Sequence, residues 1–192
     1  SVVWDRAHND EADNGLRFVT VDGVKYSLKS NKAFVLRQST ALSGSVSVRG
    51  SVEYDGTTYP VYSIEGGAFD SCRHITALSV GGIQLIDGTG AFFGCISLES
   101  VSLPEGLTEI PSETFALCSS LKNIYIPSAV SSIGSNAFTG CTSLSSAVFG
   151  NDGTWYVYAR ASSKEIRVST VSPTGNAIML RKQYCEYYWR CR

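Results

Sequence analysis

The chain has 192 residues, of which 43% are hydrophobic, with 16 basic and 17 acidic side chains. This length suits one domain or a short solenoid with an apolar core, and the net charge of −1 argues against a nucleic acid as partner of the whole molecule. No apolar run reaches the roughly 18 residues of a membrane-spanning helix, so no membrane span is predicted.

Residues 1–15 are polar, acidic and without apolar periodicity, so we expect them to form a flexible leader. The sequence begins at Ser1 and carries no signal segment. This beginning fits a mature product whose targeting segment has been removed.

Residues 16–45 alternate between apolar and polar side chains in the manner of antiparallel strands. Asp22-Gly23 separates two such segments and predicts a hairpin turn, and residues 33–37 add a third strand. We expect these strands to form an N-terminal β-hairpin cap, because an uncovered end coil would expose apolar side chains and a strand edge.

Residues 46–149 repeat a pattern every 23 residues. The interval is kept by four cysteines, four phenylalanines and four branched aliphatic residues: Cys72, Cys95, Cys118 and Cys141; Phe69, Phe92, Phe115 and Phe138; Ile75, Leu98, Leu121 and Leu144. Such a period predicts a leucine-rich-repeat solenoid, here of about five coils. The cysteines share one position in successive coils, so they are expected to form a buried ladder of free thiols instead of crosslinks.

The most regular unit, residues 118–140, predicts the path of each coil. Ile124 and Ile126 indicate a short strand that Pro127 ends, and Ala137-Phe138 is expected to close the coil as a helical turn. The fold class predicted is an α/β-type repeat solenoid, a right-handed coil with one short parallel strand per coil and antiparallel β caps at both ends. A second Asp-Gly hairpin, residues 53–62, is inserted into the first coil.

After Phe149 the period ends, and residues 150–192 are expected to form a C-terminal cap. Residues 155–159 and 165–169 indicate a closing hairpin, and residues 176–183 a short helix. Cys185 and Cys191 lie outside the ladder, and a disulfide between them and two free thiols both remain open.

Charge is unevenly distributed along the chain. Residues 64–149 carry seven acidic and two basic side chains, whereas residues 16–63 carry three acidic and six basic, and residues 150–192 three acidic and seven basic. We expect most of these charges to be solvated, since exposed ion pairs stabilise a fold little.

The unit at residues 118–140, Cys-x-x-Leu-x-x-Ile-x-Ile-Pro-x-x-Val-x-x-Ile-Gly-x-x-Ala-Phe-x-Gly, resembles the BspA-like class of bacterial leucine-rich repeats. The lead-in at residues 52–64 resembles the segment that often precedes such arrays. The resemblance implies a secreted or surface-exposed protein of the bacterial envelope that takes part in adhesion to host proteins or other cells. The resemblance implies no catalytic residues, because the members of the family share none.

Two surfaces are candidates for binding. Outward strand positions and their flanks form a predicted concave face: Ala77, Ser79, Glu99, Ser100, Ser102, Lys122, Asn123, Tyr125, Ser146 and Val148. Tyr54, Tyr59 and Tyr62 on the inserted hairpin form a predicted exposed aromatic patch. The C-terminal tyrosines and tryptophans are interpreted as packing of the end cap, with stacking on sugar rings as the alternative.

No cofactor or metal is predicted, and the protein is not expected to be an enzyme. His74 occupies a position where the other units have serine, and Asp87-Gly88-Thr89-Gly90 has no second copy to pair carboxylates. The function predicted is an interaction scaffold for an unknown protein, with carbohydrate binding through tyrosine and tryptophan side chains as the alternative.

Overall fold

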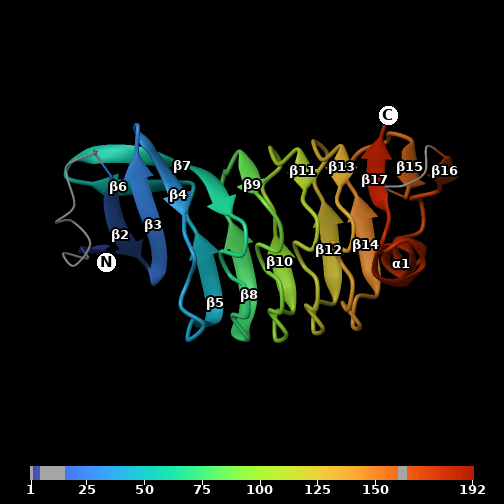
Figure 1. Ribbon diagram of the computed structural model, residues 1–192, viewed down its shortest axis with the longest axis horizontal. Coiled ribbons are helices and arrows are strands. Elements are labelled where there is room, and N and C mark those ends of the chain that lie inside the picture. The colour runs from blue at the N-terminus through green and yellow to red at the C-terminus, as the bar shows by residue number, and fades with distance from the viewer. Residues whose placement is uncertain (1, 5–15, 160–163) are drawn as a thin grey trace.

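The computed structural model, which describes residues 2–4, 16–159 and 164–192, is an elongated stack of coils (Figure 1). Strands of successive coils lie side by side along the stack, and antiparallel strands lie at both of its ends. The repeat fold predicted from the 23-residue interval is therefore confirmed.

The N-terminal end is built from two tight hairpins. Its strands are β1 (Val2–Trp4), β2 (Arg17–Val21), β3 (Val24–Lys29) and β4 (Lys32–Val35). Val21 faces Val24 across the Asp22-Gly23 turn, whose residues have φ of 50° and 82°. Positive φ at both turn residues matches the right-handed twist of the strands, so the predicted hairpin is confirmed.

The expected flexible leader is wrong for Val2–Trp4. These residues form β1, which pairs antiparallel with β2 and extends the N-terminal sheet. The remainder of that prediction, residues 5–15, lies outside the described residues.

The inserted hairpin is longer than predicted and connects the N-terminal sheet to the coils. The elements here are β5 (Ser43–Val48), β6 (Ser51–Tyr54) and β7 (Thr57–Glu65). Strands β6 and β7 meet at the Asp55-Gly56 turn, with φ of 47° and 70°. Strand β7 then runs parallel to both β4 and β9, so one strand belongs to the hairpin, the N-terminal sheet and the first coil.

Each regular coil carries two short strands, one on each side of the core. The front strands are β8 (His74–Val80), β10 (Ser100–Ser102), β12 (Asn123–Ile126) and β14 (Ser146–Phe149), and the back strands are β9 (Leu85–Asp87), β11 (Glu109–Ile110) and β13 (Ser132–Ile133). The prediction of one strand per coil is therefore wrong. Back positions such as Ile133 point into the core, and their backbones also pair with neighbouring coils.

The predicted helical turn around Ala137-Phe138 is also wrong. Residues 135–140 form hydrogen-bonded turns, and the Phe115 N–H donates to the Ala137 carbonyl of the next coil at 2.8 Å. The backbone is thus paired between coils and not along a helix. Helical residues in the described chain occur only near its C-terminal end, so the α/β-type description does not hold for the repeats.

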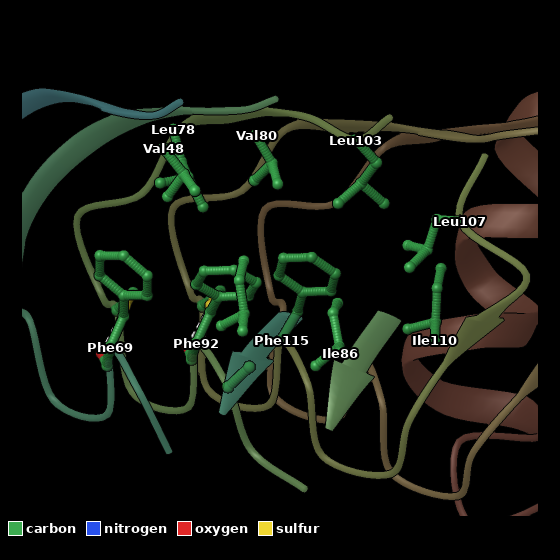
Figure 2. Close-up of a cluster of buried hydrophobic side chains, with 14 of the residues drawn as sticks. Val48, Phe69, Leu78, Val80, Ile86, Phe92, Leu103, Leu107, Ile110 and Phe115 are labelled. Carbon is green, nitrogen blue, oxygen red and sulfur yellow. Dashed lines mark hydrogen bonds between the residues drawn. The ribbon is translucent and has the colours of Figure 1, made fainter. Parts of the chain in front are cut away.

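Ladders of identical side chains fill the core, as Figure 2 shows for Phe69, Phe92 and Phe115. The four repeat phenylalanine rings stack with centroid separations of 5.3, 5.2 and 5.4 Å. The four repeat cysteines are buried and free, as predicted. The Cys118 thiol donates to the Phe92 carbonyl at 3.2 Å, and the Cys141 thiol to the Phe115 carbonyl at 3.1 Å. Each buried thiol thus satisfies a carbonyl of the preceding coil.

Two residues in the left-handed backbone conformation flank each repeat phenylalanine. In every regular coil φ is positive two residues before and two residues after the phenylalanine: Gly67 and Ser71, Gly90 and Gly94, Glu113 and Leu117, Asn136 and Gly140. Glycine adopts this conformation without strain, whereas the same conformation destabilises a residue with a Cβ atom by about 1–2 kcal/mol. Leu117 has φ of 61° and a side chain that is 46% exposed, so little packing compensates for its strain.

Replacing Leu117 with glycine is expected to raise the free energy of unfolding by about 0.5–1 kcal/mol, because relief of the left-handed strain outweighs the greater entropy of glycine in the unfolded chain. Urea denaturation followed by circular dichroism measures the change. Leu117→Ala is the control, since it removes the same exposed side chain but keeps the strained Cβ atom. A glycine variant no more stable than the alanine variant would contradict the explanation.

The C-terminal segment after the last coil packs back onto the solenoid. The elements are β15 (Trp155–Tyr158), β16 (Glu165–Val168), α1 (Pro173–Ile178), the π-helical segment Met179–Gln183 and β17 (Tyr188–Cys191). The predicted hairpin is confirmed, and a helical segment is present as predicted but begins at Pro173, three residues earlier than expected. Strand β17 lies between β15 and β13, and the rings of Trp155 and Trp189 pack on Phe149 with centroid separations of 4.9 and 6.1 Å. Cys185 and Cys191 are both free thiols.

Candidate interaction surface

The front strands bring together the side chains that were predicted to form a binding face. Ser100 faces Ala77 and Ser102 faces Ser79 across β10 and β8, while the same positions of β12 and β14 carry Asn123 and Ser146, Tyr125 and Val148. Ile124 and Ile126 point into the core between them, as alternation along a strand requires. Ala77 and Ser146 are half-buried, and the other predicted face residues are exposed.

The charges on this strand face neutralise one another. The Lys122 Nζ lies 2.5 Å from the Glu99 Oε2, and both side chains are more than half exposed. Beside them, the Ser145 hydroxyl donates to the Lys122 carbonyl at 3.2 Å. The face therefore offers short polar groups and no net charge at its centre, and the ion pair contributes little to stability.

Tyr125 and Val148 are the apolar part of the strand face. They lie directly opposite each other and are 44% and 43% exposed. The ring of Tyr125 lies against Gly150, where an added Cβ would collide with the Tyr125 hydroxyl. Glycine at this position lets the ring rest on the backbone, a role that the repeat pattern did not indicate.

A surface groove of about 780 Å³ opens beside Val148. Phe149, Asp152, Val168 and Val171 also line it, and Val171 is 88% exposed. The strand face and the groove together make one mixed apolar and polar surface at the C-terminal end of the stack. The repeat pattern does not predict the groove, because its walls come from the last coil and from segments that follow it.

The inserted-hairpin tyrosines do not form the predicted exposed patch. All three are half-buried, and Tyr54 and Tyr59 pack against the core. Tyr62 is the extra residue where Ala33 faces Val61 and Phe34 faces Ser63. Its ring lies 6.0 Å from that of Phe34 and 3.8 Å from the Lys32 Nζ.

The buried thiols are unsuited to nucleophilic chemistry. Burial raises the pKa of Cys72 to about 11 and that of Cys141 to about 12. The neighbouring Cys95 thiol, together with burial, raises the pKa of Cys118. Since the thiolate is the nucleophile, these three side chains are unreactive as nucleophiles at neutral pH, and they contribute to core packing.

A protein-family model matches the repeat region of the chain. The model for the BspA type leucine rich repeat region matches residues 56–167 in six copies, which is more than half of the chain. The chain belongs to the BspA-type leucine-rich-repeat family. No curated protein matches it.

Solved bacterial leucine-rich-repeat structures are similar to this BspA-type chain. A leucine-rich-repeat protein from Bacteroides capillosus is 29% identical with a TM-score of 0.58, covering 69% of this chain and 97% of its own. The leucine-rich-repeat protein of T. pallidum is 29% identical with a TM-score of 0.55, covering 64% of this chain and 56% of its own. Pneumococcal vaccine antigen PcpA, 15% identical with a TM-score of 0.53 over 70% of this chain and 38% of its own, shares the fold alone.

Within the described residues, no helix has the length and apolar character needed to cross a bilayer.

Proposed function

We propose that this BspA-type chain is a non-enzymatic scaffold that binds a protein partner on its strand face. The observation that carries the proposal is the pairing of Tyr125 with Val148, exposed side by side among short polar residues and next to the groove. Tyrosine is one of the residues enriched in binding hot spots, and the exposed Val148 beside Tyr125 extends its apolar contact area. A solenoid presents such positions in register, so the partner meets a rigid surface.

The family supports a secreted or cell-surface location in bacteria and a role in adhesion to host or neighbouring cells. We infer a right-handed coil, with the antiparallel strands at its two ends acting as caps. The buried Trp155 and Trp189, 0% and 2% exposed, support capping because they cover the last coil.

Burial of the aromatic side chains favours protein binding over the alternative of carbohydrate binding. The two C-terminal tryptophans are packed inside, and the hairpin tyrosines are half-buried, so flat exposed rings for stacking on sugars are scarce among the described residues. Carbohydrate binding through Tyr54, Tyr59 or Tyr62 stays a prediction.

The test is binding of the protein to immobilised extracellular-matrix proteins by biolayer interferometry, in parallel with a glycan array. The double variant Tyr125→Ser and Val148→Ser is expected to weaken protein binding by about tenfold or more, because truncating a hot spot typically costs over 1–2 kcal/mol.

The matched control is Ile96→Ser with Leu117→Ser, which removes two side chains of similar exposure, 40% and 46%, from the coil corner. Equal losses in both double variants would contradict the strand face as the binding site. Binding confined to the glycan array would favour the carbohydrate alternative instead.

A further inference from the structure

A second surface, on the outward face of the C-terminal sheet, is rich in tyrosine and arginine. Strands β15, β16 and β17 lie at the end marked C in Figure 1. Alternation sends Trp155, Val157 and Trp189 inward, where all three are buried. The opposite side carries what we call the tyrosine–arginine face: Tyr156, Tyr158, Arg167, Tyr188, Arg190 and Arg192.

Strand register places these side chains next to one another. Tyr156 lies directly opposite Arg167 on β16 and directly opposite Arg190 on β17. Tyr158 lies opposite Tyr188, and their rings stack with centroids 5.7 Å apart and planes 23° apart. One row across the sheet is thus Arg190, Tyr156 and Arg167, with the tyrosine between two arginines.

Two of the guanidinium groups are held in place by tyrosine rings. The Arg190 Cζ lies 5.2 Å from the Tyr158 ring centroid, and its Nη2 donates to the Tyr158 hydroxyl at 3.4 Å. The Arg192 Cζ lies 5.3 Å from the Tyr156 ring centroid. Cation–π contact of this kind orients a guanidinium group before any partner arrives, which lowers the entropy lost on binding.

Positive charge on this face exceeds negative charge. Glu165 is the acidic side chain on the same side of the three strands, and Arg192 already pairs with it at 2.9 Å. Among the described residues, no carboxylate lies within ion-pair distance of Arg167 or Arg190. Both arginines are exposed, so their donors are open to a ligand.

We propose that the tyrosine–arginine face binds an acidic polypeptide segment. Guanidinium groups pair with carboxylates through two parallel hydrogen bonds, and Arg167 and Arg190 are available for such pairing. The rings argue against a sugar or an unstacked base as the ligand. Arg190 and Tyr188 contact the Tyr158 ring and Arg192 contacts the Tyr156 ring, so these faces are occupied and not free to stack on a ligand.

This site adjoins the strand face, because Arg167 lines the groove that opens beside Val148, but most of its residues lie on different strands. It lies on β15 to β17, whereas Tyr125 and Val148 lie on β12 and β14. The two surfaces also differ in chemistry, since the strand face is neutral at its centre and the tyrosine–arginine face is cationic. The tyrosine–arginine face is therefore distinguished from the strand face by its charge and by the strands that carry it.

The experiment measures fluorescence anisotropy of a fluorescein-labelled peptide of alternating glutamate and glycine at low ionic strength, where charge interactions are least screened. Arg167→Glu is expected to weaken binding by about tenfold, because it converts one charge-assisted hydrogen bond into a repulsion. Arg167→Gln, which only removes the charge, is expected to weaken binding by about threefold.

Arg73→Glu is the matched control, because it makes the same charge change at an exposed coil corner and should alter the affinity by less than about twofold. The Tyr125→Ser and Val148→Ser variant should bind the peptide as the parent does, which separates this site from the strand face. Equal weakening by Arg73→Glu and Arg167→Glu would show unspecific charge attraction and overturn the proposal. Absence of saturable peptide binding, or binding of polygalacturonate in its place, would also overturn it.

Discussion

Replacing Phe115 with alanine is expected to lower the free energy of unfolding by about 3–5 kcal/mol. Phe115 is fully buried in the middle of the phenylalanine stack, 5.2 Å from the Phe92 ring and 5.4 Å from the Phe138 ring. Its removal leaves a cavity and breaks two ring contacts at once. The surrounding coils are fixed by backbone hydrogen bonds, so they have little freedom to close the cavity.

The Phe115→Ala variant is also expected to unfold less cooperatively. Each coil contacts only its neighbours, so weakening one interface in mid-array separates the stack into two parts. Guanidinium denaturation followed by circular dichroism measures both the free energy and the slope of the transition. Phe93→Ala is the control, because Phe93 follows Phe92 in the preceding coil and is only half-buried. A loss of unfolding free energy below about 1 kcal/mol, or one equal to that of the control, would show that Phe115 does not act as a core residue.

Replacing Gly134 with alanine is expected to destabilise the fold by about 3 kcal/mol, at the upper end of the cost of overpacking. An added Cβ would fall on the backbone nitrogen of Ser112 in the preceding coil and lie 2.6 Å from its Cα atom. The Gly134 N–H also donates to the Ile110 carbonyl at 2.8 Å. Since the clash is between backbones, no side-chain rotation relieves it, and the two coils must separate.

Gly106→Ala provides the comparison for Gly134→Ala. No atom lies within 4 Å of the Cβ position at Gly106, so alanine fits there. We expect this control to change stability by less than about 1 kcal/mol, and in the stabilising direction, because alanine reduces the entropy of the unfolded chain. Thermal unfolding compares the two variants. Similar melting temperatures would show that Gly134 is not needed for the close approach of the coils.

The two surfaces differ in how far the sequence predicted them. Outward positions such as Tyr125 and Val148 follow from strand alternation and the 23-residue interval, so the strand face was predictable residue by residue. Exposure was not predictable for Tyr54 and Tyr59, because it depends on which side of the inserted hairpin meets the core. The row of Arg167, Tyr156 and Arg190 joins three strands whose pairing order no local pattern gives.

The repeat fold and its interior follow from the 23-residue interval in the sequence. A coil that recurs every 23 residues places Phe92, Phe115 and Phe138 at one position, and likewise the cysteines, so burial of one implies burial of all. The ends of the array depend instead on strand pairings between distant segments. Strand β17 pairs with β13 across more than fifty residues of sequence, and β7 joins the N-terminal sheet to the first coil. Such pairings depend on which strand edges remain free once the coils have stacked, and a free edge is a property of the assembled stack and not of any segment within it.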